Sequence, residues 1–186
     1  ESHKGRFVKV VTKRPAGKRY LGWGLEDIEN RFSFLYHKGI SNNIISNAQH
    51  TESDATGIGL YNNNSKNKIV STFNCVYNNK TNSTLTNYYN VAEDGPGDFT
   101  DKDPLFVSAG TSNPDYHLKS KAGRYTSSGW VYGTDPNTSP CIDAGEQSSN
   151  YTNEPLFNGG RVNMGAYGNT IYASKSPCKI KNTLTN

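Results

Sequence analysis

Four acidic residues stand at matched positions in this sequence and could do chemistry together. An offset of 25 in residue number leads from Asp27 to Glu52, and the same offset leads from Glu29 to Asp54. If segments at this offset stack as neighbouring strands, the paired carboxylates lie about 5 Å apart, which is the spacing between strands. Carboxylates at that distance repel one another unless a cation or a shared proton lies between them.

Two kinds of site use carboxylates at this spacing. A calcium ion takes about 6–8 oxygen ligands, which a set of Asp, Glu and Asn side chains can supply. Retaining glycoside hydrolysis uses two carboxylates about 5–5.5 Å apart, one as acid and one as nucleophile. The alternative is that the acids lie on solvated loops, where the register is loose. The candidates for catalysis and for calcium binding are thus the same residues: Asp27, Glu29, Glu52 and Asp54.

Residues of two further kinds could contact a glycan. Arg31 and His37 follow the first acidic pair and supply cationic or basic groups. Aromatic side chains could stack on sugar rings, although such residues also commonly cover a core or cap the end of a coil. The aromatic candidates are Trp23, Tyr88, Tyr89, Trp130 and Tyr132.

A repeated pattern suggests which elements would position these residues. Residues 34–46 and 59–71 share Leu, Tyr, Asn, Ile and Ser at matched places, again with an offset of 25. A period of roughly 20–50 residues is typical of a solenoid. Each unit holds two short apolar runs divided by Gly, Asn and Ser, which predicts stacked coils of short strands, as in a parallel β-helix. The stacked pairs expected from this register are Leu35 on Leu60, Ile44 on Ile69, and Asn42 on Asn67.

The composition is polar for an ordered chain. Only 33% of the 186 residues are hydrophobic and the mean hydropathy is −0.77, which would also suit disorder. The repeat, 12 Tyr, 7 Phe and 2 Trp favour order, and Asn side chains can hydrogen-bond along a stack. The net charge of +4 comes with no nucleic-acid motif, so we expect no nucleic-acid partner and favour anionic glycans.

The C-terminal part carries four segments in a distinctive order. They read DPLFV at 103–107, DYHLKS at 115–120, SPCIDAG at 139–145 and GGRVNMGAYG at 159–168. This succession resembles the C-terminal end of secreted right-handed parallel β-helix proteins of the pectate-lyase-like superfold, found on bacterial and archaeal surfaces. The usual form has Ala where Cys141 stands here. The resemblance implies that these segments close the last coils of the stack and are not an active site.

We therefore expect an all-β fold, a right-handed parallel β-helix (solenoid) that comprises the last coils and a C-terminal closure. The N-terminal strands or a first coil are expected at 1–31, and coils with a period of about 25 residues at 32–107. A closing segment is expected at 108–175 and a polar tail at 176–186. Within the closing segment we expect a salt link between Asp143 and Arg161. His117 lies in an alternating strand, so we expect its ring to face outward.

The three cysteines have no metal-ligand spacing. Cys141 and Cys178 flank the closing segment, and an extracellular location would permit a disulfide between them. Cys75 lies in a short apolar run, so we expect a buried free thiol.

Two classes of function fit these observations at an extracellular or cell-surface location. The first is a glycan-active or glycan-binding protein of the polysaccharide lyase or glycoside hydrolase type, with polysaccharide as its partner. The second is a non-catalytic surface, adhesion or filament-forming protein. The acids favour the first; the lack of a recognised active-site signature favours the second. The chain begins at Glu1, so we expect a processed product or fragment that associates with itself or with a missing N-terminal part. No stretch predicts membrane insertion.

Overall fold

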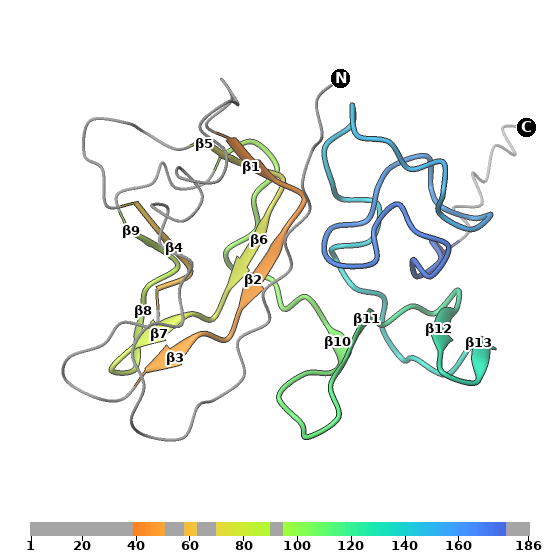
Figure 1. Ribbon diagram of the computed structural model, residues 1–186, viewed down its shortest axis with the longest axis horizontal. Helices are drawn as coiled ribbons and strands as arrows, with labels where there is room; N and C mark the ends of the chain where they lie inside the picture. Colours follow the sequence, from red (N-terminus) through yellow and green to blue (C-terminus); the bar gives the residue numbers. More distant parts are fainter. Residues whose placement is uncertain (1–38, 51–57, 63–69, 90–94, 178–186) are drawn as a thin grey trace, which may run out of the picture.

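The computed structural model describes residues 39–50, 58–62, 70–89 and 95–177 (Figure 1). Within these ranges the regular elements are short strands in small sheets, and no helix occurs. The prediction of an all-β fold is therefore confirmed.

The first group of strands occupies residues 39–89 and lies in the left half of Figure 1. Each strand has only two or three residues, because a corner or turn follows almost at once. The strands are β1 (Gly39–Ser41), β2 (Ile44–Ser46), β3 (Gln49–His50), β4 (Leu60–Tyr61), β5 (Val70–Thr72), β6 (Cys75–Tyr77), β7 (Lys80–Thr81), β8 (Thr84–Leu85) and β9 (Tyr88–Tyr89).

The second group lies in the right half of Figure 1, where long loops continue beyond the strands as far as residue 177. Its strands form two antiparallel pairs, β10 with β11 and β12 with β13. They are β10 (Phe106–Ser108), β11 (Asp115–Leu118), β12 (Arg124–Thr126) and β13 (Gly129–Val131).

The first group is built on parallel pairing between one turn of the chain and the next. β1, β2 and β3 pair with β5, β6 and β7 at an offset of 31, and β4 pairs with β9 at an offset of 28. Ile44 therefore lies opposite Cys75 and not Ile69, and Leu60 lies opposite Tyr88. The predicted offset of 25 is wrong for these strands. Leu35, Asn67 and Ile69, the partners predicted, lie outside the described residues.

Residues with left-handed backbone conformation make the corners between these strands. Asn42 and Asn47 have φ of 65° and 58°, and the matching residues of the next turn, Phe73 and Asn78, have φ of 53° and 54°. Asn adopts this conformation at less cost than most residues. Each of the two turns thus has a first and a second corner, and the corners of one turn match those of the next at an offset of 31.

A polar ladder runs along the first corner. The Asn43 N–H donates to Asn74 Oδ1 (2.9 Å), and the Asn74 N–H donates in turn to Asp98 Oδ1 (2.8 Å). Asn74 Nδ2 also donates to the Ile40 carbonyl of the preceding turn (2.7 Å). Asn74 is fully buried, so each of these bonds satisfies a group that water does not reach.

The second corner repeats the same arrangement. The Ala48 N–H donates to Asn79 Oδ1 (3.0 Å), the Asn79 N–H donates to Asn87 Oδ1 (3.1 Å), and Asn79 Nδ2 donates to the Ile45 carbonyl (3.0 Å). Asparagine side chains therefore link successive turns at both corners, as the Asn-rich composition indicated.

Two apolar clusters lie on opposite faces of the β2–β6 sheet. Leu60, Val76 and Tyr88 pack together on one face, with Ile40 and Ile45 against them. On the other face, Ile44 and Cys75 pack against the C-terminal half through a set that also includes Phe106, Leu118, Cys141, Ile142 and Met164. The sheet is thus covered on both sides, and its second face joins the two halves of the molecule.

Asn42 supplies the main polar link between the halves. Its carbonyl accepts from the Gly165 N–H (2.9 Å). Its side chain accepts from the Glu146 N–H (2.5 Å) and donates to Ser149 Oγ (2.8 Å). The C-terminal segment is therefore fixed to a corner of the strand region as well as to its apolar face.

We predict that Asn74→Ala lowers the free energy of unfolding by about 3 kcal/mol, because it leaves the Asn43 N–H and the Ile40 carbonyl buried without partners. Urea denaturation followed by circular dichroism measures the change. Asn137→Ala, at an exposed position, is the matched control and should change stability by less than about 0.5 kcal/mol. Equal stability of the two variants would contradict the role given to the ladder.

Candidate functional site

Most of the residues proposed from the sequence to do chemistry lie outside the part of the chain that the structure describes. These residues are Trp23, Asp27, Glu29, Arg31, His37, Glu52, Asp54 and Cys178. The four acids were grouped on an offset of 25, and the described strands use offsets of 31 and 28. Their grouping, for catalysis or for calcium, remains a prediction.

The described ranges hold neither a metal-binding cluster nor a membrane span. They contain no group of three or more His, Cys, Asp or Glu side chains that could hold a metal ion. No helix capable of crossing a membrane occurs among the same residues.

The two tyrosines proposed to bind substrate have different environments. Tyr88 is buried, and its hydroxyl donates to Asp98 Oδ2 (3.0 Å). Tyr89 is exposed and stacks on Tyr61 of the neighbouring turn, with ring centroids 4.9 Å apart and an angle of 14° between the planes. Of the two, Tyr89 is the one that a ligand could reach.

Asp143 and Arg161 do not form the salt link predicted from the sequence. Arg161 donates from Nε to the Gly145 carbonyl and from Nη2 to the Ala144 carbonyl (3.2 Å). Asp143 Oδ1 accepts from Ser176 Oγ (2.6 Å). Each side chain thus holds a separate loop at the edge of a cavity of about 470 Å³.

His117 also differs from its prediction, because its ring is buried and does not face outward. Strand β11 is covered on both faces: Leu118 packs into the core, and His117 stacks on Tyr167 with ring centroids 3.7 Å apart. Asp115 Oδ1 contacts His117 Nδ1 (2.7 Å) and accepts from its backbone N–H (2.9 Å). Nε2 has no hydrogen-bond partner among the described residues.

Aromatic side chains gather around the β12–β13 hairpin. Tyr125 lies opposite Trp130 in the hairpin and contacts its ring edge to face, with centroids 5.8 Å apart. Trp130 stacks with Tyr132 at 6.4 Å, and Tyr125 contacts Tyr172 at 4.7 Å. We call this set the aromatic strip, and it includes Phe157: Tyr125, Trp130, Tyr132, Phe157 and Tyr172.

Lys175 lies at the centre of part of the aromatic strip. Its ammonium is 4.6 Å from the ring centroid of Trp130, 5.1 Å from that of Tyr132 and 5.9 Å from that of Phe157. It also hydrogen-bonds to the Tyr132 hydroxyl (3.2 Å). A cation over aromatic faces is attracted by the ring quadrupole, which favours this position for the charge.

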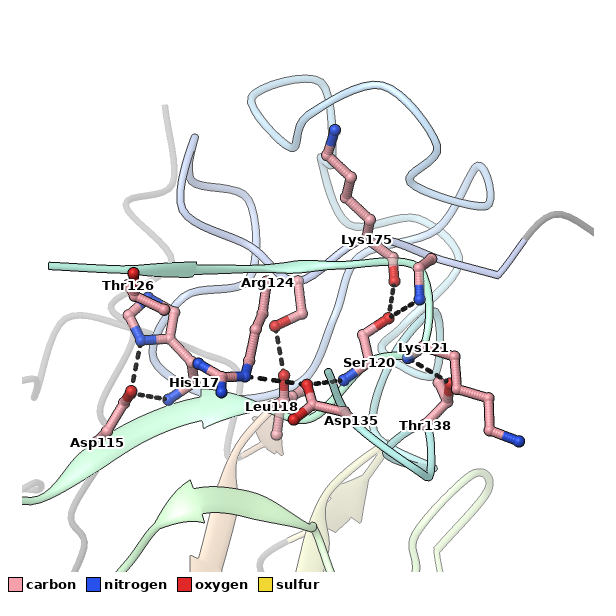
Figure 2. Close-up of polar contacts among 12 residues, drawn as sticks. Asp115, His117, Leu118, Ser120, Lys121, Arg124, Thr126, Asp135, Thr138 and Lys175 are labelled. Atoms are coloured by element: carbon pink, nitrogen blue, oxygen red, sulfur yellow. Dashed lines mark hydrogen bonds and ion pairs between the residues drawn. The ribbon is translucent and has the colours of Figure 1, made fainter. Parts of the chain in front are cut away.

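Polar contacts at the base of the hairpin fix the positions of these groups (Figure 2). Asp135 Oδ2 accepts from Arg124 Nε and from the Ser120 N–H, both at 2.9 Å. Ser120 Oγ donates to the Lys175 carbonyl (2.5 Å), and the Lys175 N–H donates to the Gly123 carbonyl (2.9 Å). The Lys175 side chain extends away from this network in Figure 2.

Gly123 is needed where the aromatic strip meets the hairpin. A Cβ at this position would lie 2.7 Å from Cδ1 of Tyr132, and φ is +121°. Any other residue would therefore push the Tyr132 ring away and strain the backbone.

The aromatic strip is open to solvent over part of its length. Tyr132 is 59% exposed and Phe157 66% exposed, and the residues that precede Phe157 and Tyr172 in the chain, Leu156 and Ile171, are 83% and 64% exposed. Large apolar side chains gathered on a surface mark a binding surface more often than single exposed ones do.

The sequence analysis named Trp130 and Tyr132 but missed Lys175 and Phe157. From Tyr125 to Tyr132, aromatic and β-branched residues lie on both sides of Ser-Ser-Gly, and this pattern predicts a β-hairpin. Lys175 is separated from Tyr132 by 43 in residue number and stands in a polar stretch. No local pattern connects it with the hairpin, because the contact depends on the path of the intervening loops.

We predict that Asp135→Asn lowers the free energy of unfolding by about 3 kcal/mol, because Arg124, whose side chain is 14% exposed, then loses its counter-charge. Urea denaturation followed by tryptophan fluorescence measures the loss. Asp115→Asn, at the more exposed carboxylate that contacts His117, is the comparison and should cost clearly less. A reversed order would show that Asp135 does not hold the hairpin.

We also predict a pH dependence from Tyr167. Burial, and then the nearby Asp115 carboxylate, raise the pKa of Tyr167 above its usual value of 10.0. The unfolded chain therefore releases this proton at a lower pH than the folded chain. The stabilisation is fully present below about pH 10 and is lost as the pH rises through the folded-state pKa.

The Tyr167→Phe variant removes this titration. Its free energy of unfolding should fall less than that of the wild type between about pH 9 and 11, as measured by urea denaturation at each pH. Asp115→Asn removes one of the two causes and should give an intermediate fall. Parallel curves for all three proteins would refute the prediction.

The comparisons with known proteins identify a family for this chain. The model of the family described as disaggregatase related matches residues 30–145, which is more than half of the chain. No curated protein and no solved structure gives a significant match. The chain therefore belongs to the disaggregatase-related family, which is found in archaeal surface proteins.

Proposed function

We propose that this chain is a glycan-binding domain of an extracellular surface protein, and that the aromatic strip around Lys175 contacts the polysaccharide. The observation that carries the proposal is the pair of exposed rings, Tyr132 and Phe157, gathered with Trp130 around one ammonium group. Aromatic faces offer rigid apolar area to the apolar faces of sugar rings. An ammonium beside them can meet a carboxylate or sulfate on the same glycan.

The charge around the strip supports an acidic glycan over a neutral one. Lys119 and Lys121 flank Ser120, whose hydroxyl donates to the Lys175 carbonyl, and the whole chain carries a net charge of +4. Surface charges of one sign raise the local concentration of an oppositely charged polymer, and salt screens the effect. Binding should therefore weaken as the ionic strength rises.

Membership of this family supports the proposed location at the cell surface. It is described as disaggregatase related, and it occurs in surface proteins, where a polysaccharide partner is accessible. Cleavage of a glycan would depend on Asp27, Glu29, Glu52 and Asp54, which lie outside the described residues. Binding through the aromatic strip does not require them, so the proposal is binding.

We further propose that the strands of residues 39–99 are turns of a right-handed parallel β-helix. Parallel pairs at offsets of 31 and 28, together with side-chain ladders at two corners, support this architecture. In such a coil the C-terminal half would present the aromatic strip from a rigid support. A crystal structure of the chain with the residues before Gly39 ordered would test whether further turns stack on β1 to β4.

Affinity electrophoresis in gels that contain polygalacturonate, chondroitin sulfate or dextran tests glycan binding. We expect retardation by an acidic polymer and less by dextran. Tyr132→Ala and Lys175→Met should each weaken binding about tenfold, since the loss of a stacking or charged contact is worth about 1.4 kcal/mol. Tyr89→Ala, at a similarly exposed tyrosine in the other half, is the matched control and should bind like the wild type.

The same experiment separates the outcomes. If the wild type is retarded and only Tyr89→Ala binds weakly, the glycan contacts the β4–β9 flank and not the aromatic strip. If no polysaccharide retards the wild type, the proposal of glycan binding fails.

A second candidate function, adhesion through contact between protein chains, is favoured by one observation. Leu156 and Ile171 are exposed aliphatic residues that directly precede Phe157 and Tyr172 in the chain, and aliphatic side chains suit a protein partner better than a sugar. Sedimentation of the wild type and of Leu156→Ser with Ile171→Ser distinguishes the two functions. Concentration-dependent self-association that the double variant loses would favour adhesion.

A further inference from the structure

Cys75 and Cys141 come from different halves of the molecule but meet in one apolar cluster. Cys75 belongs to β6 and pairs with Ile44 of β2. The Met164 N–H donates to the Cys141 carbonyl (2.9 Å), and a Cβ on Gly165 would lie 2.8 Å from Cδ1 of Ile44. The backbone around Cys141 is therefore packed against β2 and β6.

The two thiols are neighbours in this cluster and are shielded from water. Both side chains are 0% exposed, and neither forms a disulfide in the structure, so the burial predicted for Cys75 is confirmed. Both side chains belong to the same apolar cluster, and Cys75 Sγ donates to the Lys102 carbonyl (3.4 Å). A hydrogen bond with Cys141, and then burial, raise the pKa of Cys75.

We propose that Cys75 and Cys141 are the partners of a disulfide that joins strand β6 to the C-terminal segment in the mature extracellular protein. Their joint burial in one cluster, with Cys141 beside the β2–β6 sheet, is the geometric basis. Cys141 can form only one bridge, so this pairing excludes the Cys141–Cys178 bridge expected from the sequence. Cys178 is then the remaining thiol.

The oxidant is a disulfide-bearing donor, either a protein or a small molecule. The Cys75 thiolate attacks the donor disulfide, which forms a mixed disulfide and releases one donor thiol. The Cys141 thiolate then attacks the Cys75 sulfur and releases the second donor thiol. In sum, two protein thiols lose two electrons and two protons, and the donor disulfide is reduced to two thiols.

The burial of both thiols determines when this exchange can occur. A thiolate is the attacking species, and a buried thiol with a raised pKa supplies very little of it. The bridge therefore forms while the C-terminal segment is still open, and the closed, reduced protein reacts slowly.

The test begins with the 186-residue chain unfolded and reduced in urea, then refolded with reduced and oxidised glutathione. The product is alkylated in denaturant without reduction and digested with trypsin. The three cysteines fall in separate peptides, 69–80, 125–161 and 176–179. We expect a cross-linked pair of 69–80 with 125–161, and alkylated Cys178.

Three results would overturn the proposal. They are three alkylated cysteines, a cross-link between 125–161 and 176–179, and a cross-link between 69–80 and 176–179. Each shows that Cys75 and Cys141 are not joined during folding.

Thermal unfolding gives an independent readout. The bridge closes a loop of about 65 residues, so the Tm of the oxidised Cys178→Ser protein should exceed that of the same protein with dithiothreitol by about 10 °C. Cys141→Ala with Cys178→Ser cannot form the bridge, and dithiothreitol should leave its Tm unchanged. An oxidised Tm equal to the reduced Tm in the first protein would also overturn the pairing.

Discussion

The hydrogen bonds from Asn74 and Asn79 to the backbone of neighbouring turns are the interactions on which the rest of the structure depends. Strands of two or three residues leave most of their corner N–H and carbonyl groups without sheet partners. Those groups are buried here, and each unsatisfied one would cost about 1–3 kcal/mol. The two asparagines satisfy groups above and below them, so a chain with few hydrophobic residues can still stack its turns.

Local signals in the sequence were sufficient for the class of fold. Short apolar runs between Asn, Gly and Ser predict strands without helices, and the structure has strands alone in the described ranges. The offset between turns was not accessible in the same way. The connection from β3 to β4 is three residues longer than that from β7 to β9, so no single period describes the turns. Chance identities of Asn, Ile and Ser at an offset of 25 therefore favoured that offset over the observed offset of 31.

Side-chain environments were predicted less well, for a common reason. His117 lies on an alternating strand, but a loop that carries Tyr167 covers the face expected to meet water. Arg161 was expected to pair with Asp143, but its guanidinium donates instead to two nearby backbone carbonyls. In the aromatic strip, Trp130 and Tyr132 were named from the sequence as aromatic candidates, whereas Lys175 comes from a distant part of the sequence. Each case depends on how long irregular segments fold back, which no local pattern encodes.

The same contacts stabilise both halves of the molecule. Ligand binding at the aromatic strip would therefore affect the stability of the strand region as well. Among the described residues, the strand region's own cluster consists of Leu60, Val76 and Tyr88, with Ile40 and Ile45 packed against it. Its second face is covered by the C-terminal half, through Ile44 and Cys75. The strip therefore belongs to the same cooperative unit as the strands. A glycan bound to the strip would stabilise the strand region by mass action, although it would touch none of its residues.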